Sequence, residues 1–250
     1  MFSPTMRSLS AAAGLAMATA SLAACAPSSS AHGLAVVATT TQICDYVTQI
    51  AAKSTDISLA KTNASGQSTH VGTAPEGAAL TMSLTCLLAP NASAHEHEMT
   101  PAQTKALSEA DVMAVSGVDL EHFLDDAVVS SGFKGRMVVT SGVLTAADID
   151  NPGAPDPEGA YTIDRGSERV NVAPWPFPPE EAGEAPEFRF DPHVWTSPKG
   201  AHVQVANLGA GLAAAAPDAA SSINAATASY LEDIDALDQW TAEAIETVPA

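Results

Sequence analysis

Leu34-Ala-Val-Val-Ala-Thr39 is a short, almost wholly apolar run, and the residues after it change to a helical period. Such a run is typical of a parallel strand that is buried on both faces of a sheet. Thr40 or Thr41 can cap a following helix, because a threonine side chain can accept a hydrogen bond from a first-turn amide. The apolar residues of that helix recur every three or four positions, at Ile43, Val47 and Ile50. The stretch therefore predicts a buried strand followed by a helix.

The same alternation of strand and helix continues along the chain. Three further strands are predicted at residues 80–88, 112–115 and 136–140, with helices near 100–110 and 120–128. Short links between alternating elements favour a doubly wound, parallel α/β sheet, here with four strands. Two stretches interrupt the pattern and are interpreted as surface loops: the polar residues 53–79 and the acidic, proline-rich residues 148–190.

The C-terminal part of the sequence predicts helices only. One helix should run from Ser197-Pro198 to about Ala213, and a second from Asp218 to Val248. The second would be a rod of roughly 45 Å at ~1.5 Å per residue. A helix of that length suggests a strut between lobes. We therefore expect residues 33–216 to form one lobe and residues 217–250 a connecting helix.

The N-terminal residues indicate the cellular compartment in which the protein is expected. Residues 1–24 have one basic residue, Arg7, followed by a small, apolar stretch that is typical of an export signal. They end in Leu22-Ala-Ala-Cys25, which resembles a bacterial lipobox whose cysteine receives a lipid. Residues 25–32 would then be a flexible tether. We expect an extracytoplasmic protein anchored to the cell membrane through Cys25; the alternative is an ordinary export signal with a chance cysteine.

Composition excludes some classes of function. With 46% apolar residues, the chain as a whole is not a disordered protein. Its net charge of −19 excludes ordinary nucleic-acid binding, because an acidic surface repels phosphate. Two further cysteines, Cys44 and Cys86, would lie in an oxidising compartment. A disulfide between them and a pair of buried thiols both remain open.

Three of the seven histidines stand beside predicted strand ends or loop exits: His95, His97 and His193. Neutral imidazole is a favoured zinc ligand and is accepted by manganese, and a nearby carboxylate can orient the ring. His122 and His202 fall within predicted helices, where a surface role is the simpler interpretation. Two solvated loop histidines are the alternative to a metal site.

Four pieces of sequence occur in an order that resembles a known family. They are Thr39-Thr-Thr-Gln-Ile-Cys-Asp45, Leu88-Ala-Pro-Asn-Ala-Ser-Ala-His-Glu-His-Glu-Met-Thr-Pro101, Lys105-Ala-Leu-Ser-Glu-Ala-Asp111 and Asp191-Pro-His-Val-Trp-Thr-Ser-Pro198. Together they resemble the metal-binding lipoproteins that serve bacterial zinc and manganese ABC importers. The resemblance covers Leu34–Pro249 apart from the two long loops.

The resemblance implies a function and two site residues. His95 and His193 would be metal ligands from the N-terminal lobe, holding Zn²⁺ or Mn²⁺ for delivery to an ABC transporter permease. The protein would not be an enzyme. The resemblance also implies that residues 33–216 are the N-terminal, metal-binding lobe. The family's remaining ligands come from a C-terminal lobe beyond the long helix. The resemblance implies that this lobe is absent here, so we expect weak metal affinity.

The sequence also departs from the family pattern. Ala94 stands where proline usually precedes the first histidine, and His97 adds a competing imidazole as a secondary ligand. Glu98 matches the family's loop carboxylate, which we expect to shape the loop rather than to bind the ion. Between Asp148 and Asp191 there is no histidine, unlike the histidine-rich loop of many zinc importers.

Two other functions are alternatives to metal transport. A secreted metallohydrolase could use His95 and His193 with a bound water, but neither a His-Glu-x-x-His helix nor a Gly-x-Ser-x-Gly elbow occurs in the sequence. A surface adhesin would use the lipid-anchored acidic body to contact other proteins. Metal uptake without turnover would separate the receptor from the hydrolase.

Overall fold

The computed structural model describes residues 33–152, 155–156, 159–179 and 183–249. The predicted export signal 1–24, the lipidation residue Cys25 and the tether 25–32 lie outside the described residues. Within the described ranges, no helix combines the length and apolarity that crossing a bilayer requires.

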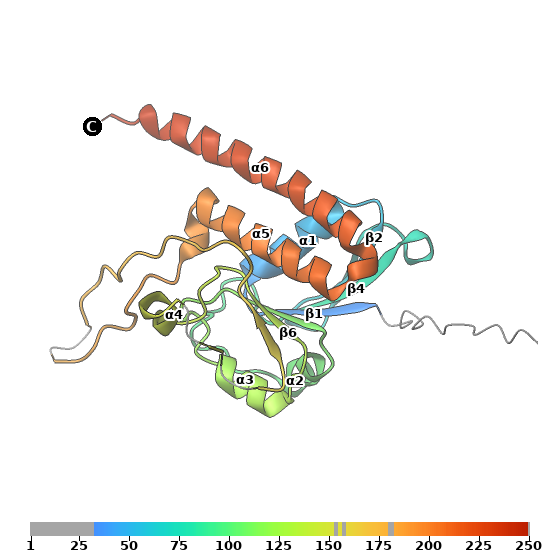
Figure 1. The fold of residues 1–250 in the computed structure, drawn as a ribbon, viewed down its shortest axis with the longest axis horizontal. Helices are drawn as coiled ribbons and strands as arrows, with labels where there is room; N and C mark the ends of the chain where they lie inside the picture. The colour runs from blue at the N-terminus through green and yellow to red at the C-terminus, as the bar shows by residue number, and fades with distance from the viewer. Residues whose placement is uncertain (1–32, 153–154, 157–158, 180–182, 250) are drawn as a thin grey trace, which may run out of the picture. The chain divides into compact units, whose positions relative to one another are not determined.

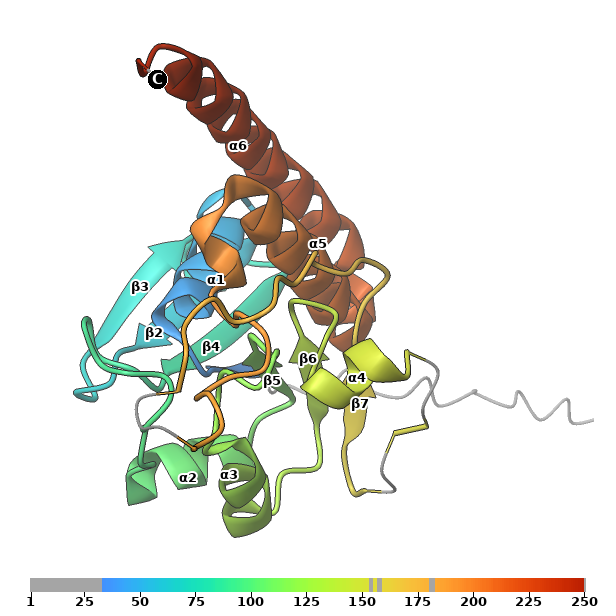
Figure 2. The same cartoon turned by 90° about the vertical axis from the view of Figure 1, so that its left-hand side faces the viewer.

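A mostly parallel sheet forms the centre of the fold (Figures 1 and 2). Its seven strands follow the order β3-β2-β4-β1-β5-β6-β7, and only β3 runs antiparallel to its neighbour. The strands are β1 (Leu34–Ala38), β2 (Ile57–Thr62), β3 (Ser68–Gly72), β4 (Leu80–Cys86), β5 (Val112–Val115), β6 (Arg136–Val139) and β7 (Thr162–Asp164). The α/β class with a parallel sheet is confirmed, whereas the expected count of four strands is wrong.

The three additional strands come from the stretches that were interpreted as loops. Residues 53–79 contain the hairpin of β2 and β3, whose turn is held by Asn63: its side-chain oxygen accepts from the amides of Ser65 and Gln67 at 3.0 and 2.9 Å. β3 is an edge strand whose only large apolar residue is Val71, so it carries little apolar strand signal. In residues 148–190, the short β7 pairs with β6 through its backbone.

Helices cover both faces of this sheet (Figures 1 and 2). One face packs against α1 (Thr41–Ala52), α5 (Pro198–Ala215) and α6 (Ala220–Glu246), and the other against α2 (Pro101–Ser108) and α3 (Leu124–Ser131). A short α4 (Ala146–Asp150) follows β6. Three 3₁₀ turns complete the described elements: Pro75–Gly77, Val194–Thr196 and Pro217–Ala219.

Alternation along the central strands divides the core in two. In β1, Val36 and Ala38 face α1, α5 and α6, while Val37 faces α2 and α3. β5 repeats the division, with Ala114 on the first face and Met113 on the second. Both faces of each central strand are buried, which is why these strands read as continuous apolar runs.

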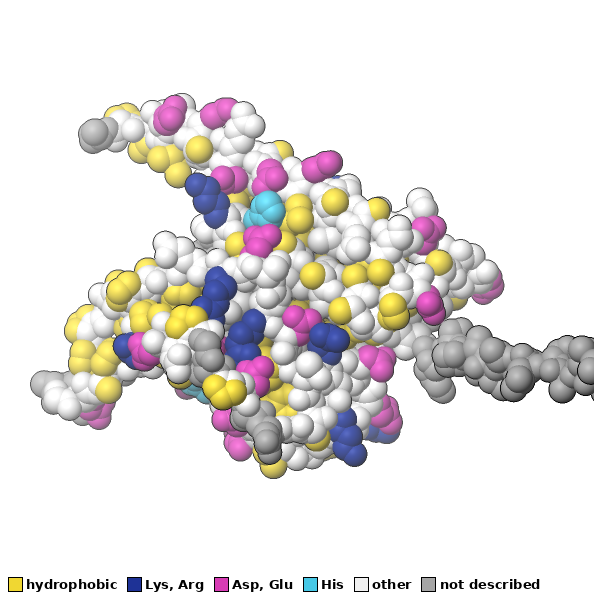
Figure 3. All heavy atoms as spheres, viewed as in Figure 1, with side chains coloured by type: hydrophobic (Ala, Val, Ile, Leu, Met, Phe, Trp, Pro, Cys, Tyr) yellow, Lys and Arg dark blue, Asp and Glu magenta, His cyan; other side chains and the backbone are white. Residues whose placement is uncertain are grey.

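Two helix boundaries differ from expectation. The helix expected at residues 120–128 begins later, at Leu124, because the preceding residues form a tight loop. The long helix expected from Asp218 to Val248 is the 27-residue α6, preceded by a 3₁₀ turn. Its first half packs on α5, and its C-terminal end extends beyond the sheet and its helices (Figures 1 and 2). Hydrophobic and acidic side chains lie together along that end (Figure 3), where Trp240 is 64% exposed.

A disulfide joins Cys44 in α1 to Cys86 at the end of β4, with the two Cα atoms 5.6 Å apart. Both cysteines are buried in the core between the sheet and α1. Of the two possibilities that the sequence left open, the structure contains the bond rather than two thiols.

Candidate metal centre

His95 lies in the segment that joins β4 to α2. At the far end of this segment, α2 begins with a capping box in which Thr100 and Gln103 bond each other's backbone amides. The Gln103 side chain also donates to the Leu87 carbonyl at 2.7 Å and so ties the two ends of the segment together. Within it, the His95 amide donates to the Ser93 hydroxyl at 3.1 Å. This local bonding fixes the backbone that carries the imidazole.

The His95 ring is oriented by a backbone carbonyl. Its Nδ1 lies 3.2 Å from the carbonyl oxygen of Leu120, which can only accept a hydrogen bond. The proton of the neutral ring therefore sits on Nδ1, and Nε2 keeps its lone pair. An imidazole whose second nitrogen donates to a carbonyl is the form in which proteins present histidine to metals.

His193 is oriented in the same way, by a side chain instead of the backbone. Its Nδ1 lies 2.8 Å from a carboxylate oxygen of Asp191, which also accepts the backbone amide of His193 at 3.0 Å. The Thr196 hydroxyl donates to the His193 carbonyl at 2.7 Å and closes the turn that follows. Here too, Nε2 keeps its lone pair free.

The fold brings these two imidazoles together. Their ring centroids are 5.6 Å apart and their planes are 76° to one another, although the residues are far apart in sequence. Two imidazoles bound to one zinc ion at ~2.0–2.1 Å per bond place their ring centroids about 5 Å apart. Both rings line a cavity of about 190 Å³, together with Thr41, Gln42, Ala92 and Trp195. The cavity lies at the carboxyl ends of the parallel strands, the usual ligand position in such sheets.

Three residues that the sequence did not assign to this region pack against the pair: His122, Phe188 and Trp175, whose ring centroid lies 5.9 Å from that of His193. The centroid of the His122 ring is 5.9 Å from that of His95, and Phe188 lies 5.0 Å from His95 and 5.4 Å from His122. His122 was assigned to a helix, but it precedes α3 and follows the carboxyl end of β5. The rule that loops after parallel strands meet at one edge of the sheet could have found it. Phe188 comes from the irregular acidic segment and offered no such signal.

His97 and Glu98 do not join the pair. The His97 ring packs edge-on against Phe123, with centroids 5.0 Å apart, and its Nε2 is buried without a hydrogen-bond partner. Burial lowers the pKa of His97, which keeps the ring neutral. Glu98 is exposed to solvent. Among the described residues, no group of three His, Cys, Asp or Glu side chains converges closely enough to hold an ion.

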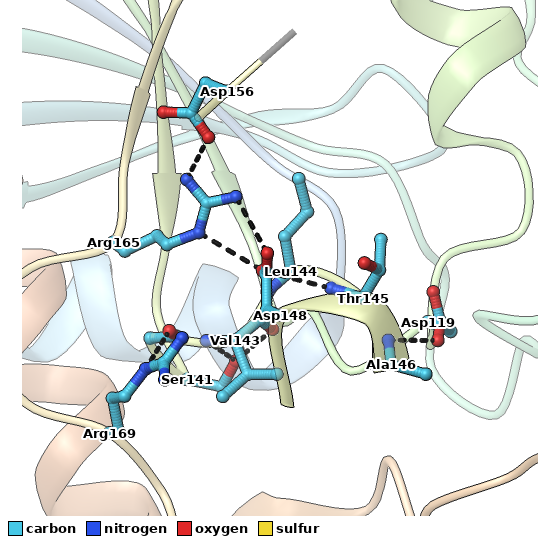
Figure 4. Close-up of polar contacts among 11 residues, drawn as sticks. Asp119, Ser141, Val143, Leu144, Thr145, Ala146, Asp148, Asp156, Arg165 and Arg169 are labelled. Atoms are coloured by element: carbon cyan, nitrogen blue, oxygen red, sulfur yellow. Dashed lines mark hydrogen bonds and ion pairs between the residues drawn. The ribbon is translucent and has the colours of Figure 1, made fainter. Parts of the chain in front are cut away.

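Ion pairs hold the long segment that leads to His193 (Figure 4). Arg165 donates to both oxygens of Asp148, at 3.1 and 3.2 Å, and also to Asp156. Burial by itself would raise the pKa of Asp148. Hydrogen bonds from Arg165 and from the Leu144 amide, together with the arginine charge, outweigh burial and leave that pKa below its usual value. The segment is therefore fastened to the turn after β6.

Comparison with known proteins gives a consistent result. The family model described as zinc-uptake complex component A, periplasmic (ZnuA), matches residues 78–250. The manganese-binding lipoprotein MntA of Halalkalibacterium halodurans is 27% identical over 155 residues, which make up 62% of this chain and 40% of MntA.

Solved structures show the same fold at low sequence identity. Zn(II)-bound AdcA from Streptococcus pneumoniae aligns with a TM-score of 0.53 at 18% identity, over 85% of this chain and 32% of AdcA. A crystal structure of ZnuA aligns with a TM-score of 0.55 at 16% identity, over 87% of this chain and 62% of that protein. The chain thus spans less than two thirds of the length of each of these proteins.

Proposed function

This chain belongs to the ZnuA family of zinc-uptake components, whose model matches it over residues 78–250, and from that membership we propose that it captures Zn²⁺ or Mn²⁺ outside the cytoplasmic membrane for an ABC importer. His95 and His193 would bind the ion, a permease would receive it, and a lipid on Cys25 would keep the protein at the membrane. The resemblance of the sequence to metal-binding lipoproteins is confirmed by the family match. The identity of the bound ion, its delivery to a permease and the lipid anchor on Cys25 are what we propose.

The observation that carries the proposal is the geometry of one histidine pair. His95 and His193 lie with their ring centroids 5.6 Å apart, and each has its Nδ1 engaged by an oxygen acceptor. Both Nε2 atoms are therefore ready to bind a cation without a change of tautomer. A pair of neutral imidazoles favours Zn²⁺ over Mn²⁺, which binds more weakly to the same nitrogen ligands.

This arrangement supports binding without turnover. Two protein ligands leave the remaining coordination positions to water or to other groups, so the affinity should be well below that of a closed four-ligand zinc site. The chain covers 40% of MntA, a manganese-binding lipoprotein. We propose that the ion is bound as cargo and that no bond in a substrate is broken.

Calorimetric titration with Zn²⁺ and Mn²⁺ tests this function. The expected result is one ion per chain, with zinc bound more tightly, and at least a tenfold loss of zinc affinity in His95→Ala and in His193→Ala. His70→Ala is the matched control, because His70 lies on the β2–β3 hairpin, where its Nε2 pairs with the Ser58 hydroxyl at 3.0 Å. Zinc affinity that is unchanged in both His95→Ala and His193→Ala would overturn the proposal.

A further inference from the structure

Glu121 is a buried carboxylate beneath the candidate metal centre. It is 6% exposed, and no lysine or arginine in the described part of the chain forms an ion pair with it. One carboxylate oxygen lies 2.6 Å from the Thr39 hydroxyl and accepts the Ser116 amide at 2.7 Å. The other accepts the Gly117 amide at 3.1 Å. Burying a carboxyl group is unfavourable unless its hydrogen bonds are satisfied, and here they are satisfied by Thr39 and by two amides of one short loop.

That loop has an unusual backbone. Gly117, Val118 and Asp119 have φ angles of 87°, 58° and 55°, so three consecutive residues are in the left-handed region. For a β-branched residue such as Val118 this conformation is strained, by about 1–3 kcal/mol. Such a backbone persists only where several contacts enforce it.

The loop is held from two sides. On one side, the Glu121 carboxylate accepts the amides of Ser116 and Gly117. On the other side, the amides of Val118 and Asp119 donate to the carbonyls of Val143 and Leu144 at 2.8 and 3.1 Å. The Asp119 carboxylate accepts the Ala146 amide at 2.7 Å (Figure 4).

The strained loop ends by presenting the Leu120 carbonyl to the metal centre. Leu120 is fully buried, and its carbonyl oxygen is the acceptor 3.2 Å from Nδ1 of His95. A side-chain acceptor can be oriented by its own rotamer, but a backbone carbonyl is oriented only by the loop that contains it. His193 differs, because its acceptor is the carboxylate of Asp191.

We propose that Glu121 is a positioning residue for the metal centre: by holding the Ser116–Asp119 loop, it aims the Leu120 carbonyl at His95 and so sets the tautomer in which His95 presents Nε2 to the ion. The metal-binding part of this inference rests on the proposed function. The effect on the ring is a property of the metal-free protein. Loss of Glu121 should change the tautomer of His95 alone, since the His193 ring is held by Asp191.

Imidazole ¹⁵N chemical shifts of the full, metal-free chain at pH 8 test the inference, because they report which ring nitrogen carries the proton. In the wild type, His95 should be protonated on Nδ1. In Glu121→Met, which removes both oxygens at nearly the same side-chain length, His95 should become a mixture of the two tautomers while His193 stays unchanged. Zinc affinity should fall by about ten- to a hundredfold.

The control for a general loss of stability is Asp111→Asn. The Asp111 carboxylate also accepts a backbone amide, that of Ala35 at 2.8 Å, but at the opposite, amino end of the strands. This variant should leave the tautomers of both site histidines unchanged.

A milder pair of variants covers the case in which Glu121→Met does not fold. Thr39→Val removes the hydroxyl that bonds Glu121 and should shift His95 in the same direction, while Thr39→Ser keeps the hydroxyl and should not. A wild-type His95 tautomer in both Glu121→Met and Thr39→Val, or in Thr39→Val alone if Glu121→Met is unfolded, would overturn the inference. If the wild type binds no zinc, the proposed function fails. The tautomer of His95 in the metal-free protein still tests the role of Glu121.

Discussion

At the level of single residues, the candidate centre depends on two imidazoles whose Nδ1 atoms are fixed by different means. The backbone carbonyl of Leu120 fixes His95, and the side chain of Asp191 fixes His193. In both arrangements Nε2 carries a free lone pair, which is the chemical requirement for binding a cation. If the two rings bind an ion as proposed, little reorganisation should accompany binding.

His97 provides the first prediction, because it is the nearby imidazole that the structure separates from the pair. His97→Phe should leave zinc affinity within twofold of the wild type. It should also raise the free energy of unfolding by about 1 kcal/mol, because a buried nitrogen without a partner is removed from a site that already packs on an aromatic ring. Calorimetry and urea unfolding measure the two quantities. A tenfold loss of zinc affinity would show that His97 is a ligand.

The second prediction concerns Arg165 and pH. Arg165→Met should lower the free energy of unfolding by about 1–2 kcal/mol at pH 7, because Asp148 loses two charge-assisted hydrogen bonds. The pKa of Asp148 is lower in the folded protein than its usual value, so its contribution is present above about pH 4 and is lost as the pH falls below that. The difference between variant and wild type should therefore shrink in acid.

Urea unfolding at pH 7 and pH 3.5 measures this difference, and Arg169→Met is the control. Arg169 donates to a backbone carbonyl, that of Gly142 at 3.1 Å, rather than to a carboxylate (Figure 4). Its effect should be the same at both pH values. An Arg165→Met effect that is equally insensitive to pH would contradict the role assigned to Asp148.

Some residues of the candidate site could be proposed from the sequence and others could not, for physical reasons. His95 and His193 stand in loops with a family-like pattern, so they could be predicted as ligands. Leu120 acts through a carbonyl that every residue possesses, and its role is invisible in the side-chain sequence. Phe188 reaches the site from an irregular segment whose path depends on tertiary contacts.

At the level of elements, the central strands β1, β5 and β6 could be predicted because they are mostly apolar and buried. β4 could be predicted from its alternation of buried apolar and exposed polar residues. Each of the four strands lies within two residues of its expected bounds. The β2–β3 hairpin was not predicted in this way, because β3 is a mostly exposed edge strand with Val71 as its only large apolar residue. β7 spans only Thr162–Asp164, too short for a period to be recognised. The interpretation of residues 53–79 as a surface loop was therefore wrong for β2, whose Ile57 and Leu59 are buried in the core, and correct about exposure for most of β3.

The third prediction concerns the bond between α1 and β4. Thiol titration of the unfolded, unreduced Cys25→Ser chain should find no free thiol, since Cys44 and Cys86 are bridged. Replacing both by serine should lower the free energy of unfolding by about 4 kcal/mol, because the bond closes a loop with a sequence separation of 42. Two titratable thiols in the unreduced chain would contradict the bridge.

At the level of the whole molecule, the chain has one face of α6 without a packing partner among the described residues. Leu237, Trp240 and Ile245 are at least half exposed near its C-terminal end. The chain covers 62% of the ZnuA of known structure, at a TM-score of 0.55. The expectation that further ligands belong to a second lobe stays a prediction, and the two histidines account for the binding proposed here.

The coordination shell of zinc bound to this chain gives the most direct measurement. X-ray absorption spectra of the protein loaded with one equivalent of zinc should contain the scattering of two imidazoles, with Zn–N bonds of about 2.0–2.1 Å. His95→Ala and His193→Ala should each show one imidazole fewer, while His97→Phe should match the wild type. Wild-type spectra from both alanine variants would contradict the account.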